Sequence, residues 1–286
     1  MKARPSRRRP ILVRRRLADA GVVLLTLAGA GLVLFPIFWM GLASVRPVAE
    51  VLAYPPEWIP QEFTLQYYQD LFKTDEYVQY LRNSYIVAGG TTLWSLFLAA
   101  MAAYGFSRYK VPGGRAILLG MLALYMMPGV SLVLPYFRIS MGLHLYDTRL
   151  GLILAYSSFV LPMATWLLKG YMDSIPIDLE EAALVDGATR MGALRRILLP
   201  LVAPGLVATG TMGFLGAWNE YFFAVVLTSS IKAQTLTVGI GRFFGQYTRD
   251  WNGIMALTTF ASLPLLLIFV LIQRWVVQGM TAGAVK

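Results

Sequence analysis

Long apolar stretches alternate with shorter polar segments along this chain. A helix needs about 20 mostly apolar residues to cross a bilayer. The stretches that meet this length lie at roughly residues 19–44, 83–106, 115–137, 150–170, 201–228 and 252–274. The pattern therefore predicts an all-α polytopic membrane protein with six transmembrane helices.

The first apolar stretch could instead belong to a secretory signal. Its apolar part runs from Ala20 to Ala43, whereas the apolar core of a signal spans about 7–15 residues. No convincing cleavage site follows it. We therefore expect an uncleaved first span.

Composition supports a membrane location. Of the 286 residues, 57% are hydrophobic and only 14% are charged, against about 25% charged residues in soluble domains. A net charge of +10 would be compatible with nucleic-acid binding, but eight of the 25 basic residues fall within the first sixteen positions, directly before an apolar run. That distribution favours contact with membrane lipid over contact with nucleic acid.

The basic residues also predict the orientation of the spans. With the N-terminus inside, the inside segments hold 17 Lys and Arg residues and the outside segments hold 8. Basic residues concentrate on the cytoplasmic side, so both termini are expected there. The predicted domains are a basic cytoplasmic segment at 1–18, a six-span membrane domain at 19–274 and a cytoplasmic tail at 275–286.

The first outside segment, residues 46–82, differs from the other loops. It contains six acidic residues and four prolines. The run 54–60 cannot form a regular helix, because Pro lacks an N–H and restrains the residue before it, while Thr64 to Phe72 has helical spacing. Two interpretations stay open: a structured cap over the membrane domain, and a docking surface for an external partner.

Prolines and glycines interrupt the predicted spans. Such residues are tolerated in membrane helices because neighbouring helices re-satisfy the freed backbone groups, and small residues let helices approach closely. A hinge function stays open beside this packing function. The positions concerned are Pro36, Pro128, Pro135, Pro162, Pro264, Gly89, Gly90, Gly205, Gly210, Gly213 and Gly216.

The polar loop at 171–200, between the fourth and fifth spans, is the most informative segment. Pro176 suits a first helical turn, and Asp178 followed by Glu181 resembles a capping box. Gly187 suits a break between two short helices, because it has no Cβ. A second helix is expected from Thr189 to Leu198, with an apolar stripe made of Met191, Leu194, Ile197 and Leu198.

The same loop contains the pattern E-A-A, three residues, G, nine residues, I, one residue, L-P, from Glu181 to Pro200. This pattern, in a loop between spans, resembles the cytoplasmic coupling loop of permease subunits of bacterial ATP-binding-cassette importers. The competing interpretation is an amphipathic helix that lies on lipid headgroups. All seven motif positions are in register, which favours the coupling loop.

The resemblance extends beyond this loop and covers nearly all of the chain after its first 18 or so residues. The chain is similar to MalG-type permeases of carbohydrate importers of the maltose/multiple-sugar class. The similar segments, in order, are Tyr54–Trp58, Asn83-Ser84, Ala103–Arg108, Trp218–Phe222 and Gln273–Lys286.

This resemblance implies a MetI-like fold with cytoplasmic coupling helices, in a bacterial inner membrane. It implies a complex with a second, MalF-like permease subunit, two ATP-binding subunits and an extracytoplasmic sugar-binding protein, which together import a sugar. In the family, the acid that matches Glu181 anchors the coupling helix in a cleft of the ATPase. The C-terminal tail reaches toward the ATPase pair, and the loop between the last two spans, here about 229–251, can enter the cleft of the binding protein. The coupling residues expected here are Glu180, Glu181, Ala182, Ala183, Asp186, Gly187, Ile197, Leu199 and Pro200.

No residue of the chain is expected to be catalytic. The sequence lacks the G-x-x-x-x-G-K-[ST] phosphate loop, so ATP hydrolysis is expected from partner subunits. His144 is the one His and there is no Cys, which leaves no Cys/His zinc site and no Ser/His/Asp constellation. We expect no metal and no cofactor.

A secondary transporter or channel for a small polar solute is the alternative function. Such proteins show paired repeats and charged relays inside spans, and neither is clear here. Glu220 is the one acid well within a span, beside Asn219. Two roles stay open for it: local hydrogen bonding, and contact with sugar hydroxyls in a translocation pathway to which Asn83 and Asn219 would also belong. A membrane-anchored interaction protein, the third class, would not need six spans.

Overall fold

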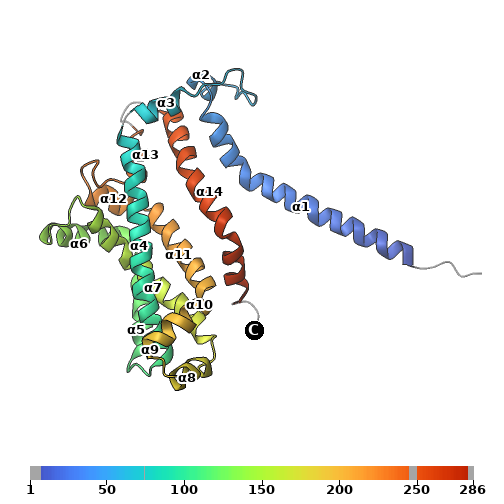
Figure 1. The fold of residues 1–286 in the computed structure, drawn as a ribbon. Helices are drawn as coiled ribbons and strands as arrows, with labels where there is room; N and C mark the ends of the chain where they lie inside the picture. Colours follow the sequence, from blue (N-terminus) through green and yellow to red (C-terminus); the bar gives the residue numbers. More distant parts are fainter. Residues whose placement is uncertain (1–7, 74, 245–249, 283–286) are drawn as a thin grey trace, which may run out of the picture. The chain divides into compact units, whose positions relative to one another are not determined.

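The computed structural model describes residues 8–73, 75–244 and 250–282 (Figure 1). The chain divides into two compact units. Unit 1 contains the chain up to Gln69 together with Asp250–Phe260, and unit 2 contains Asp70–Arg249 together with the chain from Ala261 onward. Residues 1–7 of the predicted basic segment, 245–249 of the last outside loop and 283–286 of the predicted tail lie outside the described residues.

The described residues form helices and no β-strand, as the apolar pattern predicts. In chain order the helices are α1 Arg8–Ala43, α2 Val48–Val51, α3 Gln66–Lys73, α4 Asp75–Arg108, α5 Gly114–Tyr125, α6 Gly129–Gly142, α7 Arg149–Asp173, α8 Asp178–Val185, α9 Arg190–Ala193, the π-helical turn η1 Leu194–Leu198, α10 Leu199–Leu201, α11 Ala203–Trp218, α12 Phe222–Leu227, α13 Leu236–Gly241 and α14 Trp251–Ala282.

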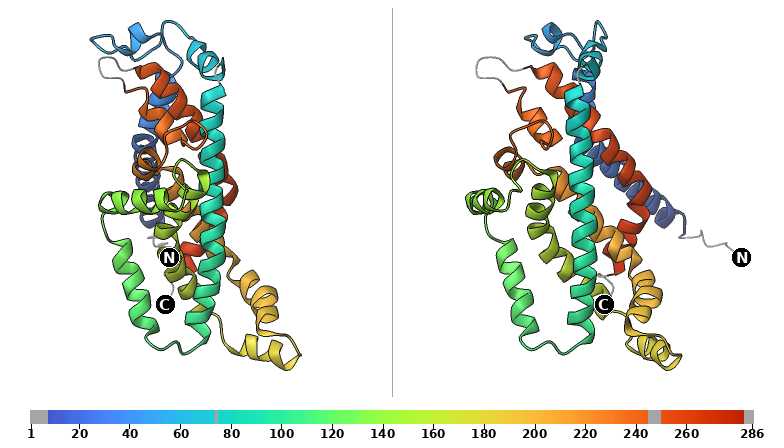
Figure 2. Two further views of the ribbon diagram at one scale, coloured as in Figure 1. Left: turned by 90° about the vertical axis from the view of Figure 1, so that its left-hand side faces the viewer. Right: turned by 60° about the vertical axis from the view of Figure 1, so that its left-hand side comes forward.

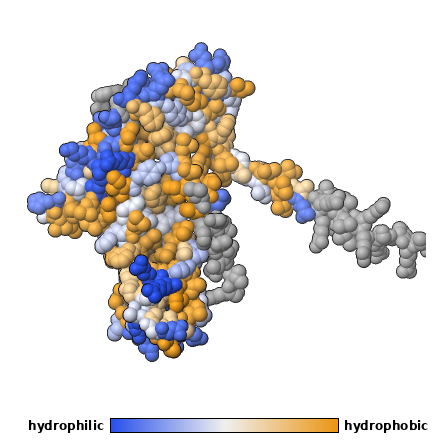
Figure 3. Space-filling view, in the orientation of Figure 1, coloured by the Kyte–Doolittle hydropathy of each residue, from blue (hydrophilic) through white to orange (hydrophobic). Residues whose placement is uncertain are grey.

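Four of the described helices contain a segment long and apolar enough to cross a membrane. These segments are Asp19–Ala43, Asp75–Arg108, Arg149–Asp173 and Trp251–Val270, and two bent helix pairs raise the number of candidate spans to six. Figure 3 shows apolar side chains over much of the visible surface. A protein surrounded by water would bury most of that surface, so the fold agrees with the predicted six-span membrane protein.

The third and fifth spans are not continuous helices. Between α5 and α6 the chain bends by 97° at a break of Met126–Pro128, where Pro128 supplies no N–H and disfavours helical backbone in the residue before it. The helical segment Arg190–Leu201 meets α11 at 76°. The predicted stretch 201–228 is divided again, because α11 ends at Trp218 and α12 begins only at Phe222.

Three helices, α4, α7 and α11, pack together in unit 2 and lie side by side in Figure 2. Small residues permit this packing, as the sequence predicts. A Cβ atom at Gly210 would lie 2.9 Å from Leu96 Cδ1, and one at Gly205 would lie 2.5 Å from the Tyr171 ring. At Gly216, by contrast, a Cβ atom would have no neighbour within 4 Å.

In unit 1 a buried arginine organises the start of the segment 46–82. The Arg46 guanidinium donates hydrogen bonds to the carbonyl oxygens of Glu57 and Trp58, at 2.7 and 2.8 Å. The Asn252 side chain donates to the Arg46 carbonyl oxygen at 2.7 Å. These bonds hold the proline-rich run in place without helix, and the helix predicted at 64–72 is present as α3.

Candidate functional site

The 171–200 loop folds as two short helical segments joined by a tight turn. The first is α8, and the second is formed by α9, η1 and α10. Gly187 has φ +85°, the left-handed region that favours glycine. Its N–H donates to the Leu184 carbonyl at 3.1 Å, and the Ala188 N–H donates to the Ala183 carbonyl at 2.9 Å. The predicted helix break at Gly187 is confirmed.

The helix starts differ in part from the sequence prediction. The prediction of a capping box formed by Asp178 and Glu181 was wrong, because Asp178 is already the first residue of α8 and no side chain caps that helix. Asp178 still favours the helix there, since a negative charge in the first turn complements the helix dipole. The second helix starts as expected, because Thr189 Oγ1 accepts a hydrogen bond from the Gly192 N–H at 3.1 Å.

The predicted apolar stripe of the second segment holds only in part. Leu194 and Leu198 are fully buried, but Met191 is 58% exposed and its assignment to the stripe was wrong. The segment changes register at η1, where the Leu199 N–H donates to the carbonyl of Leu194, five residues back. A sequence pattern at α-helical spacing does not anticipate this turn.

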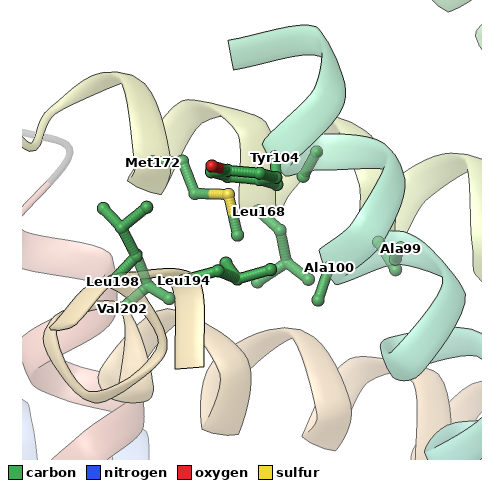
Figure 4. Packing of buried hydrophobic residues seen from close by; sticks show 10 residues of the cluster. Ala99, Ala100, Tyr104, Leu168, Met172, Leu194, Leu198 and Val202 are labelled. Atoms are coloured by element: carbon green, nitrogen blue, oxygen red, sulfur yellow. The ribbon is translucent and has the colours of Figure 1, made fainter. Parts of the chain in front are cut away.

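A buried apolar cluster fastens the second segment to the membrane helices. Leu194, Leu198 and Val202 pack against side chains of α4 and α7 (Figure 4). The loop is therefore a rigid extension of these helices. The cluster consists of Ala99, Ala100, Ala103, Tyr104, Ala164, Leu168, Met172, Leu194, Leu198 and Val202.

Glu180 fastens the first segment through polar contacts with α4. The Tyr104 hydroxyl donates to Glu180 Oε1 at 2.5 Å, and Arg108 Nε donates to Oε2 at 3.0 Å. Arg108 also donates to the carbonyl oxygen of Ile175 at 3.1 Å. Glu180, one of the expected coupling residues, is buried, so its side chain lies beneath the loop and not at its exposed surface. Sequence reasoning missed its partner, although Arg108 belongs to a segment already singled out.

The next residues of α8 face outward. Glu181, Ala182, Asp186 and Gly187 are exposed, whereas Ala183 is buried. Val185, which the sequence analysis did not single out, is 87% exposed, and its position four residues after Glu181 on a helix was the available signal. We call Glu181, Ala182, Val185, Asp186 and Gly187 the exposed tip. Of the remaining motif residues, Ile197 and Leu199 are half-buried and Pro200 is exposed.

A cavity of about 350 Å³ lies between α7, α11 and the end of α5 in unit 2. The Glu220 carboxylate lies at its edge and caps α12, accepting from the Phe223 N–H at 3.1 Å and the Ala224 N–H at 3.2 Å. Glu220 interacts electrostatically with Tyr156, but the geometry falls short of a hydrogen bond. The lining residues are Tyr125, Tyr156, Phe159, Val160, Met163, Ala164, Leu167, Thr209, Met212, Gly213, Gly216, Ala217 and Glu220.

Two buried hydroxyls at this cavity have no partner among the described residues. They belong to Tyr156 and Thr209. Buried polar groups in proteins are nearly always hydrogen-bonded, so the two unmatched hydroxyls in the wall of this cavity make it a candidate site for a polar ligand. Sequence reasoning singled out Glu220 but neither hydroxyl, because the pairing depends on the packing of α7 against α11.

The other two candidate pathway residues lie elsewhere. Asn83 is buried, donates to the carbonyl oxygens of Ile231 and Gln234 at 2.8 and 2.7 Å, and accepts from Arg149 Nε at 2.8 Å. Asn219 is exposed and donates to the Leu215 carbonyl at 2.8 Å. Neither lines the cavity, so the structure does not bring the three residues together.

The start of the loop at 229–251 is fastened by Asp147. Its Oδ1 accepts from the N–H groups of Ser229 and Ser230, both at 2.9 Å, and its own N–H donates to the Leu227 carbonyl at 2.9 Å. Burial raises the pKa of the Asp147 carboxyl, but the hydrogen bonds from Ser230 and Ser229 outweigh burial and leave the pKa below its ordinary value.

Within the described ranges no group of three or more His, Cys, Asp or Glu side chains is placed to hold a metal ion.

Residues 95–282 match the family model of the binding-protein-dependent transport system inner membrane component.

Curated relatives match over most of their length. An inner membrane ABC transporter permease protein, YcjP, of Escherichia coli is 36% identical over 88% of this chain and 91% of the relative. The trehalose transport system permease protein SugB of Mycobacterium tuberculosis is 37% identical over 90% of this chain and 93% of the relative. The trehalose/maltose transport system permease protein MalG of Thermococcus litoralis is 34% identical over 96% and 98%.

A solved structure has the same fold. It is a crystal structure of a bacterial ABC transporter involved in the import of the acidic polysaccharide alginate, with a TM-score of 0.76 and 20% identity over 96% of this chain and 99% of that chain.

Proposed function

The chain belongs to the family of binding-protein-dependent transport system inner membrane components, and on this premise we propose that it is the permease subunit of an ATP-driven sugar importer. Relatives named for trehalose and for trehalose/maltose transport support a sugar as the solute. In the proposed complex it forms half of the translocation pathway, beside a second permease subunit, two ATP-binding subunits and an extracytoplasmic sugar-binding protein.

The observation that carries this proposal is the combination of an exposed tip with a buried base in one loop. Glu180 and the apolar cluster fix the loop to α4 and α7, while Glu181, Ala182 and Val185 remain open to a partner. A loop built this way transmits displacement between a bound partner and the membrane helices, because packed elements move together. We infer that the exposed tip docks on an ATP-binding subunit, and therefore that this loop and both termini are cytoplasmic.

The cavity between α7 and α11 supports the transport half of the proposal. A sugar presents hydroxyls that donate and accept hydrogen bonds, and its ring carbons pack on aromatic faces. The cavity offers the Glu220 carboxylate and the ring of Phe159, and the hydroxyls of Tyr156 and Thr209 lie buried within its wall. Binding sites typically combine apolar walls with a few such polar groups. We infer that a sugar unit contacts this cavity during passage.

Reconstitution tests the proposal. The purified chain alone, in proteoliposomes, is expected to show neither ATPase activity nor uphill sugar uptake. Addition of the second permease, the ATP-binding subunits and sugar-loaded binding protein is expected to give ATP-dependent uptake. Sugar accumulation by the chain alone, driven by a proton or sodium gradient, would overturn the proposal in favour of a secondary transporter.

A further inference from the structure

A second, open cavity of about 660 Å³ lies in unit 2 at the end of the membrane helices that leads into the coupling loop. The C-terminal end of α4, the turn that follows it, the start of α5 and the end of α7 form its walls. The lining residues are Phe106, Tyr109, Lys110, Val111, Gly114, Arg115, Leu118, Leu119, Trp166, Lys169, Gly170 and Asp173.

The charges at this cavity are mostly positive. Its lining contains three basic residues, Lys110, Arg115 and Lys169, and one carboxylate, Asp173, which pairs with Lys169 at 2.5 Å. Among the residues that the structure describes, neither Lys110 nor Arg115 has a carboxylate partner. A fourth cation lies next to the cavity, since the Arg190 guanidinium stacks 5.2 Å from the centre of the Tyr109 ring. The cavity is therefore electrostatically matched to an anion.

The rest of the wall is apolar and open. Leu119 is 50% exposed and Trp166 is 43% exposed, and Val111 and Tyr109 are exposed beside them. Trp166 lies seven residues before the end of α7, about 10 Å along the helix, a depth at which tryptophan is enriched at membrane–water interfaces. A small soluble anion would gain nothing from these apolar side chains. A molecule with an anionic head and an apolar tail would contact both parts.

We propose that this cavity binds the headgroup of an anionic phospholipid, with the phosphate beside Lys110 and Arg115 and an acyl chain along Leu119 and Trp166. Basic pockets between membrane helices on the cytoplasmic side have the chemistry for such headgroups. The position of the cavity in the cytoplasmic leaflet rests on the proposed function, because the orientation follows from the docking of the coupling loop. The bound lipid would bridge α5 and α7 directly beneath that loop.

Lipid binding to the full-length chain, purified in mild detergent with its co-purifying proteins, tests the proposal. After delipidation, native mass spectrometry compares added phosphatidylglycerol with phosphatidylcholine. A basic residue near an anionic lipid surface contributes about a fivefold factor in affinity. The double variant Lys110→Gln/Arg115→Gln is therefore expected to bind phosphatidylglycerol about 25-fold more weakly than wild type. The control Lys73→Gln/Arg138→Gln removes the same charge away from the cavity and is expected to leave binding unchanged.

A second measurement needs no charge change. Phosphatidylglycerol with brominated acyl chains is expected to quench part of the tryptophan fluorescence of the wild-type chain. This quenching is expected to be absent from the Trp166→Phe variant. Brominated phosphatidylcholine is expected not to cause it. Three outcomes would each overturn the proposal: equal binding of both lipids, wild-type binding by the double variant, and full displacement of the lipid by inorganic phosphate. The last outcome would favour a free anion as the ligand. Because neither measurement involves ATP or sugar, failure here is distinct from failure of the proposed importer function.

Discussion

Glu180 and Arg108 are 72 residues apart in the chain, yet Glu180 Oε2 lies 3.0 Å from Arg108 Nε. The two side chains are 4% and 5% exposed. The pair joins the first helix of the 171–200 loop to the end of α4, and the Tyr104 hydroxyl completes the coordination of the carboxylate. The orientation of the loop thus depends on a charge pair that is shielded from water.

Removal of one partner of this pair is expected to destabilise the protein. Glu180→Ala leaves the buried Arg108 guanidinium without its counter-charge, and an uncompensated buried charge costs about 3–5 kcal/mol. We expect a clearly lower melting temperature in detergent. The matched control is Lys73→Ala, which breaks an exposed pair with Asp70 worth about 0–1 kcal/mol. Equal melting temperatures for the two variants would show that the buried pair does not hold the loop.

The neighbouring acid is expected to behave in the opposite way. Glu181 is exposed, so Glu181→Lys is expected to leave the melting temperature of the isolated chain unchanged. The lysine would place a positive charge against a basic or hydrogen-bond-donor group of the ATP-binding subunit. Loss of one partner of a buried charged pair costs about 2–5 kcal/mol of binding free energy. Mild-detergent purification is therefore expected to lose the ATP-binding subunits. Normal co-purification together with normal sugar uptake would exclude the exposed tip as the docking surface.

The contrast between Glu180 and Glu181 shows how far the sequence could predict this site. The helix break at Gly187 and the start of the second helix near Thr189 depend on neighbouring residues, so sequence alone predicted both. The inward turn of Glu180 depends on Arg108 in a different helix, and no local pattern contains that information. Both acids were therefore expected among the coupling residues, although Glu180 is buried and Glu181 is exposed.

The membrane helices follow the same rule. Apolar length predicted where the spans lie, because the bilayer sets a minimum number of residues. It did not predict the bend between α5 and α6 or the division of the fifth span after Trp218. The unmatched hydroxyls of Tyr156 and Thr209 come from different helices and become recognisable only when α7 and α11 pack together.

Substitutions at Gly187 are expected to follow backbone strain. A non-glycine residue at φ +85° costs about 1–2 kcal/mol, and Asn tolerates this region best. Gly187→Val is expected to retain partial ATPase binding but to lose stimulation of ATP hydrolysis by loaded binding protein. Gly187→Ala is expected to be milder, and Gly187→Asn mildest. A Cβ atom here has no neighbour within 4 Å in this chain, so equal effects of Val, Ala and Asn would indicate close packing against the partner subunit instead.

The contact of Asp147 with Ser229 and Ser230 is expected to weaken in acid. The folded-state pKa of Asp147 is lowered, so its stabilising contribution is present above the ordinary pKa of about 3.9. This contribution is lost as the pH falls from there through the lowered pKa. Protection of the Ser229 and Ser230 amides from hydrogen exchange, taken relative to the intrinsic exchange rate at each pH, is expected to fall in that window. In Asp147→Asn, which retains an acceptor oxygen but does not titrate, this fall in protection is expected to be absent. The same acid response in wild type and variant would assign it to another group.

Tyr156→Phe separates a structural function of the cavity from contact with the solute. The Tyr156 hydroxyl is buried without a partner among the described residues, so its removal is expected to leave the melting temperature unchanged or slightly raised, because an unsatisfied buried polar group is costly. If a sugar hydroxyl bonds there, the variant loses one hydrogen bond of about 0.5–1.5 kcal/mol. The full complex is then expected to need a roughly 3–10-fold higher sugar concentration to reach the same rate of uptake.

The control is Tyr80→Phe, which also removes a buried unmatched hydroxyl but lies outside the cavity. We expect Tyr80→Phe likewise to leave the melting temperature unchanged or slightly raised, and to leave uptake unchanged. Equal uptake by the two variants would indicate that the cavity is a packing void that the solute does not contact. A loss of uptake confined to Tyr156→Phe would place the solute against α7.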